Sequence, residues 1–295
     1  MLKKNLIKQK IKQKIKNTVP QFIINYIRKL QDNIRNDAKP VRKLLRFEIN
    51  LTDHCNLNCK CCSHYSPLAK ENFYNIDSLE RDFQQLSQLA DKKVNFTINL
   101  IGGEPLLHPQ LIDIMMLCRK YFDSNVIINT NGTLLLKQPA EFWTTCQNLK
   151  IDISMSIYPI KIDIEKITQI CQQYGIKLQT SMLGLRYRWF NLNKDCRGQQ
   201  NKKHSFANCT IQCVTLENGK LYACTMPCVA KHFNAYFGET FKVSKKDYID
   251  IYKVKNIKKI FKFISRPIPF CRYCRPQEYK SMKWGQSKKE MEEWT

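Results

Sequence analysis

DHCNLNCKCC, residues 53–62, is the stretch of sequence that decides the fold. Within it, Cys55, Cys59 and Cys62 have the spacing C-x3-C-x2-C. Three thiolates on one tight loop can hold three irons of a 4Fe–4S cube, because thiolate is the usual ligand of such clusters. No fourth ligand is obvious beside them in the sequence. One iron therefore stays open for a small molecule, as a catalytic metal site requires.

Two predicted strands bring this loop close to a second motif. Residues 44–51 alternate apolar and polar side chains and predict a strand that ends at the cysteine loop. Residues 94–100 alternate in the same way and run into Gly102-Gly103-Glu104-Pro105. Ligand-binding loops lie at the carboxyl ends of strands in α/β barrels and open α/β sheets, so the two motifs are expected to form one site. Two glycines let the backbone approach a ligand closely, and a carboxylate accepts hydrogen bonds from an ammonium group.

Each motif also has a plainer interpretation when it is taken alone. C-x3-C-x2-C can be part of a zinc site, for which Cys61 and His64 are the nearest further ligands. The Gly-Gly-Glu-Pro stretch can be a turn with a buried acid. The placement of both motifs after successive predicted strands favours the single-site interpretation.

Together the two motifs resemble those of the radical S-adenosylmethionine (SAM) superfamily, and the resemblance covers roughly residues 47–182. It implies that the cluster ligands are Cys55, Cys59 and Cys62, and that the SAM amine is held by Gly102, Gly103 and Glu104. From their strand positions, four further residues are expected to contact the ribose or carboxylate of SAM: Asn129, Asn131, Ser154 and Ser156. The alternative is that these residues are only the ordinary polar positions of strands and turns. The family usually has an aromatic residue before the third cysteine. This chain has Cys61 there, and Cys61 has no assigned role.

The order of predicted elements indicates the fold class. Strands and helices alternate with short connections, which is typical of a mostly parallel α/β sheet. The right-handed crossover rule favours a barrel or an open barrel. We therefore expect a partial (β/α)6 TIM-like barrel over residues 44–204, whose first helix begins with a capping box of Asp77 and Glu80. Further strands are expected at residues 126–130, 150–158 and 176–182, and helices at 77–90, 108–122, 139–146 and 164–174.

From residue 205 the alternation stops and cysteines become dense, so residues 205–295 are expected to form a small Cys-rich hairpin-plus-helix domain. An Asn-Gly turn at 218–219 predicts a β-hairpin, and Cys213 and Cys224 lie on its two arms. Cys271 and Cys274 form a C-x2-C knuckle. These four cysteines resemble the ligands of the twitch auxiliary domain, the short relative of the SPASM domain. The resemblance implies an auxiliary 4Fe–4S cluster.

Spacing leaves alternatives open for the other cysteines. A structural zinc ion bound by four thiolates has the same spacing as the auxiliary site. Either Cys209 or Cys228 can replace one of the four auxiliary ligands, and Cys196 has no assigned role. Three further cysteines fall on predicted helices and are expected in the core: Cys118, Cys146 and Cys171.

The composition sets limits on the class of protein. At 295 residues, with a hydrophobic fraction of 43%, the chain can bury a sizeable core. No apolar run reaches the roughly 18 residues that a membrane span needs, and no secretion signal is evident. Without such a signal, fourteen cysteines are better explained by metal ligation than by disulfides. We therefore expect a cytoplasmic location.

The formal net charge of +24 suggests an acidic partner, and a lysine-rich composition spread over the whole chain is an equal alternative. Residues 1–43 form a basic extension in which Ile7, Ile11 and Ile15 recur among lysines, as in a helix. One interpretation places residues 1–30 on an anionic membrane surface, which would make the protein membrane-peripheral. The other packs this helix on the barrel or on a partner. Deletion of the first helix lowers liposome binding only under the first interpretation.

The resemblance also implies an activity. In this family an electron enters the cluster from a flavodoxin- or ferredoxin-type donor, SAM is cleaved reductively, and the 5′-deoxyadenosyl radical takes a hydrogen from the substrate. Residues 61–69, CCSHYSPLA, resemble radical SAM proteins associated with surface-glycan assembly. We therefore expect dehydrogenation or a related modification of a sugar or nucleotide sugar.

Two other functions remain as alternatives. One is a peptide-modifying maturase of the SPASM type. The other is a zinc-dependent nucleic-acid-binding protein, which is disfavoured because the sequence has no interleaved aromatic and basic patch and no recognition motif. No individual catalytic side chain is assigned.

Overall fold

The computed structural model describes residues 43–90, 94–181, 187–190, 194–209, 213–238, 240–276 and 280–295. Leu44–Thr295 form one compact unit. The helices expected before residue 43 lie outside the described residues. None of the helices that the structure describes is both long enough and apolar enough to cross a bilayer.

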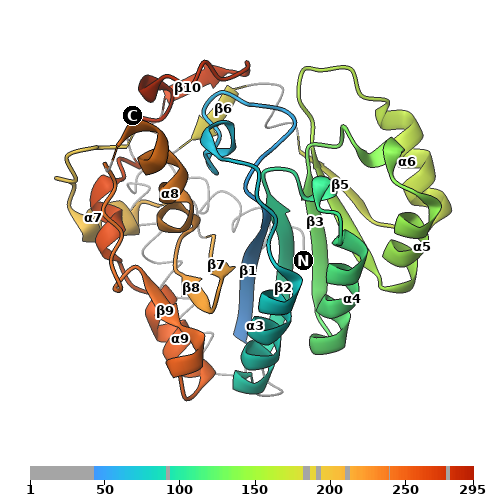
Figure 1. Cartoon of the computed structure of the whole chain (residues 1–295), viewed down its shortest axis with the longest axis horizontal. Coiled ribbons are helices and arrows are strands. Elements are labelled where there is room, and N and C mark those ends of the chain that lie inside the picture. Colours follow the sequence, from blue (N-terminus) through green and yellow to red (C-terminus); the bar gives the residue numbers. More distant parts are fainter. Residues whose placement is uncertain are drawn as a thin grey trace, which may run out of the picture. The chain divides into compact units, whose positions relative to one another are not determined.

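A mostly parallel sheet, whose strands alternate with helices along the chain, forms the frame of this unit (Figure 1). The strand order is β5-β4-β3-β2-β1-β7-β8-β9, and β2 to β5 pair in parallel. The first five strands are β1 (Lys43–Thr52), β2 (Val94–Gly102), β3 (Asn125–Thr130), β4 (Ile151–Ser156) and β5 (Leu178–Ser181). The helices between them are α3 (Ile76–Leu89), α4 (Leu111–Tyr121), α5 (Ala140–Asn148) and α6 (Ile164–Gln173). This arrangement confirms the expected α/β class with a partial TIM-like barrel.

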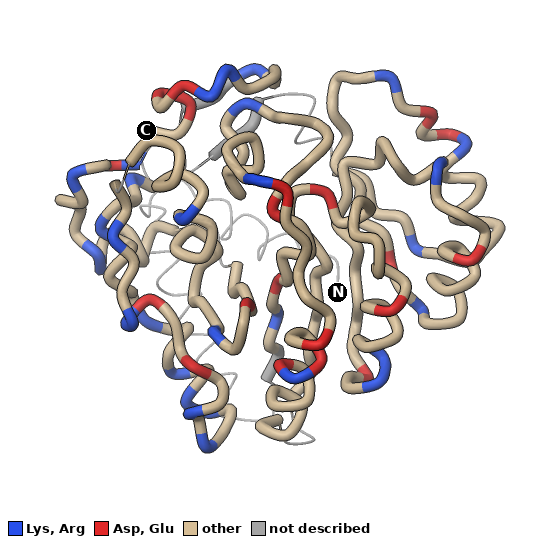
Figure 2. The backbone as a smooth tube through the Cα atoms, in the orientation of Figure 1, with Lys and Arg blue, Asp and Glu red and all other residues tan. Residues whose placement is uncertain are grey.

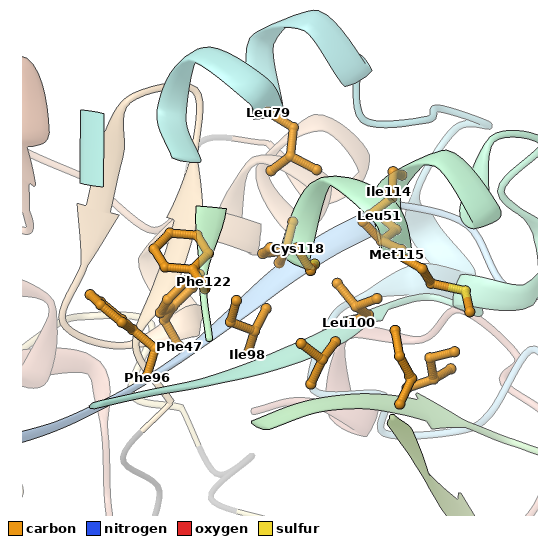
Figure 3. Packing of buried hydrophobic residues seen from close by; sticks show 14 of the residues in the cluster. Phe47, Leu51, Leu79, Phe96, Ile98, Leu100, Ile114, Met115, Cys118 and Phe122 are labelled. Atoms are coloured by element: carbon orange, nitrogen blue, oxygen red, sulfur yellow. The ribbon is translucent and has the colours of Figure 1, made fainter. Parts of the chain in front are cut away.

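Each of these strands has an apolar face and a polar face. Four side chains on the apolar face of β1 are 0% exposed: Leu45, Phe47, Ile49 and Leu51. They pack with residues of β2 and α4 (Figure 3), where the rings of Phe47 and Phe96 meet edge to face at 6.1 Å. The opposite face carries polar side chains such as Asn99 and Asn129, which are hydrogen-bonded to each other at 3.2 Å. That face is therefore suited to a polar ligand.

The first helix begins earlier than the expected capping box. The Oδ1 of Asn75 accepts a hydrogen bond from the N–H of Ser78 at 2.9 Å, so Asn75 is the N-cap and Ile76 begins the helix. The prediction that Asp77 caps this helix was wrong. Asp77 lies in the first turn instead, where a negative charge interacts favourably with the helix dipole.

The C-terminal part extends the same sheet beyond β1. β7 (Thr215–Glu217) pairs with β1 in parallel, and β8 (Lys220–Tyr222) and β9 (Tyr248–Asp250) follow in antiparallel register. Asn218 and Gly219 both have positive φ angles, 48° and 73°, as a two-residue type I′ turn requires. The predicted hairpin is confirmed. β7 to β9 share a sheet with β1, so no break in the sheet marks residue 205. The domain boundary expected there stays a prediction.

A second apolar core lies among the remaining elements. It is formed mainly by α8 (Thr225–Phe237) and the 3-10 helix η6 (Pro269–Tyr273), whereas the buried residues of α9 (Ile257–Ile264), Ile257 and Ile260, belong to the main core. The other elements of this part are α7 (Lys202–Ala207) and the antiparallel pair β6 (Tyr187–Phe190) and β10 (Lys280–Lys283). This core includes Trp294, which is 0% exposed, together with Tyr65 and Phe233. Tyr65 directly follows the cysteine loop, so the second core supports that loop.

Asp82 on α3 joins the barrel to the C-terminal hairpin. Its carboxylate is 2% exposed and accepts hydrogen bonds from the hydroxyl groups of Tyr74 at 3.0 Å and Tyr252 at 2.7 Å. It also accepts one from the N–H of Gly219, at 2.8 Å and 137 positions away in the sequence. A single carboxylate thus fixes the hairpin turn on the first helix.

Replacing Asp82 with alanine leaves two buried donors, the hydroxyl of Tyr74 and the N–H of Gly219, and the half-exposed Tyr252 without their acceptor. We expect Asp82→Ala to lower the free energy of unfolding by on the order of 3 kcal/mol, measured by urea denaturation under anaerobic reducing conditions. Asp77→Ala, at an exposed position on the same helix, is the control and should cost less than about 1 kcal/mol. Equal losses for the two variants would contradict this role for Asp82.

Candidate active site

A pocket lies at the carboxyl ends of the first four strands, and the thiols of the cysteine loop form one wall. It brings together eight of the residues expected to form the SAM-binding site: Cys55, Cys59, Cys62, Gly102, Gly103, Asn129, Asn131 and Ser156. Glu104 and Ser154 do not line it. Ser154 of β4 pairs with Asn129 of β3, and Asn129 lines the pocket.

The cysteine loop is held in a tight, partly left-handed conformation. Asn58, Cys61 and Tyr65 have φ angles of 48°, 59° and 53°, which side chains other than glycine adopt at a cost of about 1 kcal/mol each. Cys61 is 2% exposed and packs in the second apolar core, not on the pocket. The left-handed residues turn the chain so that the other three thiols of the loop reach the pocket.

Gly102 and Gly103 are required where β2 passes the cysteine loop. A Cβ atom on Gly103 would lie 1.7 Å from the carbonyl oxygen of His54, and one on Gly102 would lie 2.4 Å from that of Thr52. Hydrogen bonds join the same segments, from Gly103 N to Thr52 O at 2.8 Å and from Glu104 N to His54 O at 3.2 Å. The glycines therefore place the end of β2 directly against the loop that carries the thiols.

The carboxylate of Glu104 is completely buried and points into the protein. Its Oε1 accepts hydrogen bonds from the hydroxyl of Thr130 at 2.6 Å and from the N–H of Leu106 at 3.2 Å. Its Oε2 accepts one from the N–H of Asn131 at 2.9 Å. Burial raises the pKa of Glu104 to about 7, although these three donors favour the charged form. In this conformation the carboxylate braces the ends of β2 and β3, and the backbone of the two glycines faces the pocket.

The amide of Asn131 connects this brace to the first cysteine. Its Nδ2 donates to Asn56 Oδ1 at 2.9 Å and lies 3.7 Å from the Sγ of Cys55. Burial raises the pKa of Cys55 to about 12, and the negative charges of Glu104, Cys62 and Cys59 add to the rise. All three thiols line the same pocket. A bound metal would lower the pKa of Cys55, because a coordinated thiol is deprotonated.

The C-terminal segment closes over the cysteine loop, which no pattern in the sequence indicates. The N–H of Lys60 donates to the carbonyl of Gly285 at 2.8 Å, and the N–H of Ser287 donates to that of Asn58 at 2.8 Å. These contacts join residues more than two hundred positions apart, so no local periodicity marks them. The last strand and its tail are part of the site.

Two tryptophans of this segment contact the loop with their indole N–H groups. Trp284 Nε1 donates to the Sγ of Cys59 at 3.3 Å, and Trp294 Nε1 donates to the carbonyl of Cys62 at 2.9 Å. Hydrogen bonds to the sulfur ligands are one of the factors that set the reduction potential of an iron–sulfur cluster. Trp284 is therefore placed to affect a cluster held by this loop.

A second set of thiols lies on the C-terminal side, where Cys196 packs against the same apolar cluster as Cys224 and Cys271. Burial is the main cause that raises the pKa of Cys213, followed by Glu48 and then by the charges of Cys224 and Cys209. Burial is also the main cause that raises the pKa of Cys271, and the charges of Cys274 and Cys209 add to it. Cys209 thus accompanies the four predicted residues. Cys228 lies elsewhere, with its Sγ 3.3 Å from Oε2 of Glu217. Between the two alternatives that spacing left open, the structure places Cys209 beside the predicted set.

Two buried polar groups accompany this second set. Lys194 is 2% exposed, and its Nζ donates to the Sγ of Cys274 at 3.3 Å. The hydroxyl of Tyr65 is buried and has no hydrogen-bond partner among the described residues. Burial raises the pKa of Tyr65, followed by the charges of Cys274, Cys196, Cys224 and Cys62. A buried cation and an orphaned hydroxyl next to several thiols fit a negatively charged, sulfur-rich group between them.

The chemistry of both thiol sets fits an iron–sulfur cluster, because thiolate is the usual ligand of such clusters. Within the described residues, no group of three or more His, Cys, Asp or Glu side chains is arranged to hold one metal ion. In a 4Fe–4S cube each iron takes one protein thiolate, so the thiols need only reach different corners of a larger object. The remaining cysteines behave as expected: Cys118, Cys146 and Cys171 are at most 1% exposed and belong to the main core.

Comparison with known proteins agrees with this geometry. The family model of the radical SAM superfamily matches residues 49–157. A GTP 3′,8-cyclase of Syntrophomonas wolfei is 34% identical over 127 residues, which are 42% of this chain and 38% of that protein. A probable GTP 3′,8-cyclase of Pyrococcus abyssi is 34% identical over 94 residues, which are 32% of this chain and 29% of that protein. The chain thus spans well under half the length of these relatives.

One solved structure is similar over a larger part of the chain. The structure described as BtrN in complex with AdoMet and 2-DOIA covers 78% of this chain and 92% of its own, with a TM-score of 0.48 and 15% identity.

Replacing Glu104 with glutamine should change how stability depends on pH. The pKa of Glu104 is about 7 in the folded protein, against an ordinary value of 4.5. Burial of Glu104 therefore does not lower the free energy of unfolding below about pH 4.5, where the group is protonated in both states. The free energy of unfolding then falls progressively as the pH rises to about 7. Between about pH 4.5 and 8, the cluster-free protein should lose on the order of 3 kcal/mol of unfolding free energy that Glu104→Gln does not lose. Urea titrations at several pH values measure both slopes.

Glu141→Gln, on the exposed side of α5, is the matched control and should keep the pH dependence of the unchanged protein. Parallel pH profiles for Glu104→Gln and the unchanged protein would show that Glu104 is not the buried, proton-retaining group.

Proposed function

We propose, from the radical SAM domain that residues 49–157 form, that this chain is a radical SAM enzyme. The observation that carries the proposal is the convergence of Cys55, Cys59 and Cys62 with the backbone of Gly102 and Gly103 on one pocket. Three thiols supply three corners of a 4Fe–4S cluster, and the glycine-lined side is open to the amine of SAM. Polar side chains of β3 and β4 complete the pocket on the side where the ribose and carboxylate would lie.

When bound, the cluster and SAM supply the chemistry: one-electron reduction cleaves SAM, and the 5′-deoxyadenosyl radical takes a hydrogen atom from the substrate. The chain itself positions and shields. Asn131 fixes Asn56 and Cys55, Glu104 holds the backbone of Asn131, and the C-terminal segment covers the loop. Each contact keeps the thiols at fixed positions, so the protein does not have to reorganise when the reaction starts.

The substrate that we favour is a sugar or nucleotide sugar of glycan biosynthesis, which the enzyme would dehydrogenate or modify in a related way. The polar face of the barrel supports this choice, because Asn99, Asn129 and Ser154 offer both donors and acceptors to hydroxyl groups. Loss of hydrogen from a carbinol leaves a substrate radical that must give up one electron and one proton. The second thiol set is where the acceptor of that electron would be held.

Modification of a peptide remains the second candidate. In that case the second site would hold the substrate through a cysteine or a backbone group. The domain limits that we propose are 44–204 for the barrel and 205–295 for the auxiliary domain. The auxiliary ligands that we propose are Cys213, Cys224, Cys271 and Cys274, with Cys209 as the neighbouring fifth thiol.

Cys55→Ala should remove one cluster and end SAM cleavage. Anaerobically reconstituted protein should contain about eight irons with matching sulfide, and the variant about four. Incubation with SAM and dithionite should yield 5′-deoxyadenosine from the unchanged protein and none from the variant, measured by chromatography. Cys118→Ala, a buried cysteine of α4, is the control and should keep both the iron and the product. Zinc without iron would end the proposal.

Trp284→Phe should shift the potential of the first cluster without removing it. Loss of the indole N–H that contacts Cys59 leaves the thiolate charge less stabilised, which disfavours the reduced, more negative cluster. We expect unchanged iron content and a lower reduction potential in a redox titration followed by EPR spectroscopy. Trp143→Phe, a buried tryptophan of α5, should leave the potential unchanged. Equal potentials for both variants would show that the contact has no electronic effect.

A further inference from the structure

A basic pocket of about 500 Å³ lies on the C-terminal side, apart from the SAM pocket. Its floor is apolar and includes Phe263 and Ile268. No acidic side chain among the described residues lines the pocket. Six cationic side chains surround the floor: Lys202, Lys203, Lys246, Lys259, Lys262 and Arg266. Figure 2 shows Lys and Arg along α7 and α9 in this part of the molecule.

These cations are available to a partner. All six are exposed, and none takes part in an ion pair within the part of the chain that the structure describes. An apolar centre with a charged rim is the usual anatomy of a protein–protein interface, and charges of one sign on the rim speed the approach of a partner with the opposite sign. The surface therefore fits an acidic protein that presents an apolar side chain at its centre.

The arrangement is less suited to two other anions. A small phosphate group is usually held by a fork of arginine N–H groups or by backbone N–H groups at a helix start. Here five of the six cations are lysines spread around the rim, and Arg266 is the single arginine among the residues that line the pocket. A flat lipid surface cannot reach the floor of a concave pocket, so the apolar part of the site would stay uncovered.

The wall of this pocket continues into the second thiol set. Ile268 lies on the pocket, and its carbonyl accepts a hydrogen bond from the N–H of Cys271 at 3.1 Å. α7, which begins with Lys202 and Lys203, also holds the other cysteine of this pair, because the hydroxyl of Ser205 donates to the carbonyl of Cys274 at 2.8 Å. The elements that carry the positive charge are thus the ones that position the thiols.

We propose that this basic pocket is the docking surface of an acidic one-electron carrier protein, which exchanges one electron with the metal group held by Cys271 and Cys274. This inference rests on the proposed function, because it needs an iron–sulfur group at the second thiol set. In the step, the group held by the thiols, which has accepted one electron from the substrate radical, loses it again, and the oxidised carrier gains it. The test follows the same exchange in the opposite direction. No bond forms or breaks, and no proton is transferred.

The test compares two variants with the same change of charge. Lys259→Glu with Lys262→Glu reverses two cations of the pocket rim. Lys258→Glu with Lys137→Glu reverses two exposed lysines outside the pocket, one on α9 and one near α5. The probe is a purified flavodoxin in its hydroquinone form, mixed anaerobically with each reconstituted enzyme in a stopped-flow instrument at low and high ionic strength. Dithionite, a small reductant that needs no docking surface, serves as the second reductant.

We expect the rate constant for reduction by flavodoxin to fall about tenfold or more in the pocket variant at low salt, and the difference to shrink at high salt. The control pair should lose less than about threefold, and reduction by dithionite should be the same in all three proteins. Equal rates with flavodoxin in the two variants, or an unchanged enzyme that dithionite reduces and flavodoxin does not, would overturn the docking proposal and leave the proposed function in place.

Failure of the proposed function gives a different result. Enzyme that binds no iron shows no reduction by either reductant, and this result would remove the docking proposal as well. Co-sedimentation with vesicles of phosphatidylglycerol, and titration with inorganic phosphate, test the other two anions. Binding of either probe that only the pocket variant loses, together with an unchanged flavodoxin rate, would assign the pocket to that anion instead.

Discussion

The backbone of Gly103 lies so close to the backbone of His54 that no side chain fits between them, and two hydrogen bonds join the segments on either side. This contact fixes the end of β2 against the cysteine loop. Glu104 extends the same fixation to β3, because its buried carboxylate accepts from Thr130 and from the backbone of Asn131. The pocket therefore depends on three strand ends that are locked to one another.

The parts of this structure that could be predicted are those with a local signal in the sequence. The strand before Cys55, the Gly-Gly turn after β2 and the Asn218-Gly219 hairpin each have a short pattern with a physical reason, and all three are present. The prediction that Asp77 caps α3 was wrong because Asn75, two residues earlier, was not considered, and its side chain accepts from the free N–H group of Ser78.

Other features depend on contacts between distant parts of the chain and leave no local pattern. Trp284 meets Cys59 across 225 positions, and Lys194 meets Cys274 across 80. A lone tryptophan or lysine in a tail has many ordinary explanations, so neither could be chosen from sequence. The orientation of Glu104 is a similar case. The motif shows that a carboxylate lies near the site, and only the positions of Thr130 and Leu106 show which way it points.

These distant contacts also connect the two thiol sets. Trp294 donates its indole N–H to the carbonyl of Cys62, and its own carbonyl accepts from the N–H of Lys194 at 3.2 Å. Lys194 in turn donates to Cys274, and Tyr65 lies buried against Trp294 with thiols of both sets near its ring. A displacement of either loop must therefore move the same buried residues. The shared residues thus hold the two thiol sets at a fixed separation.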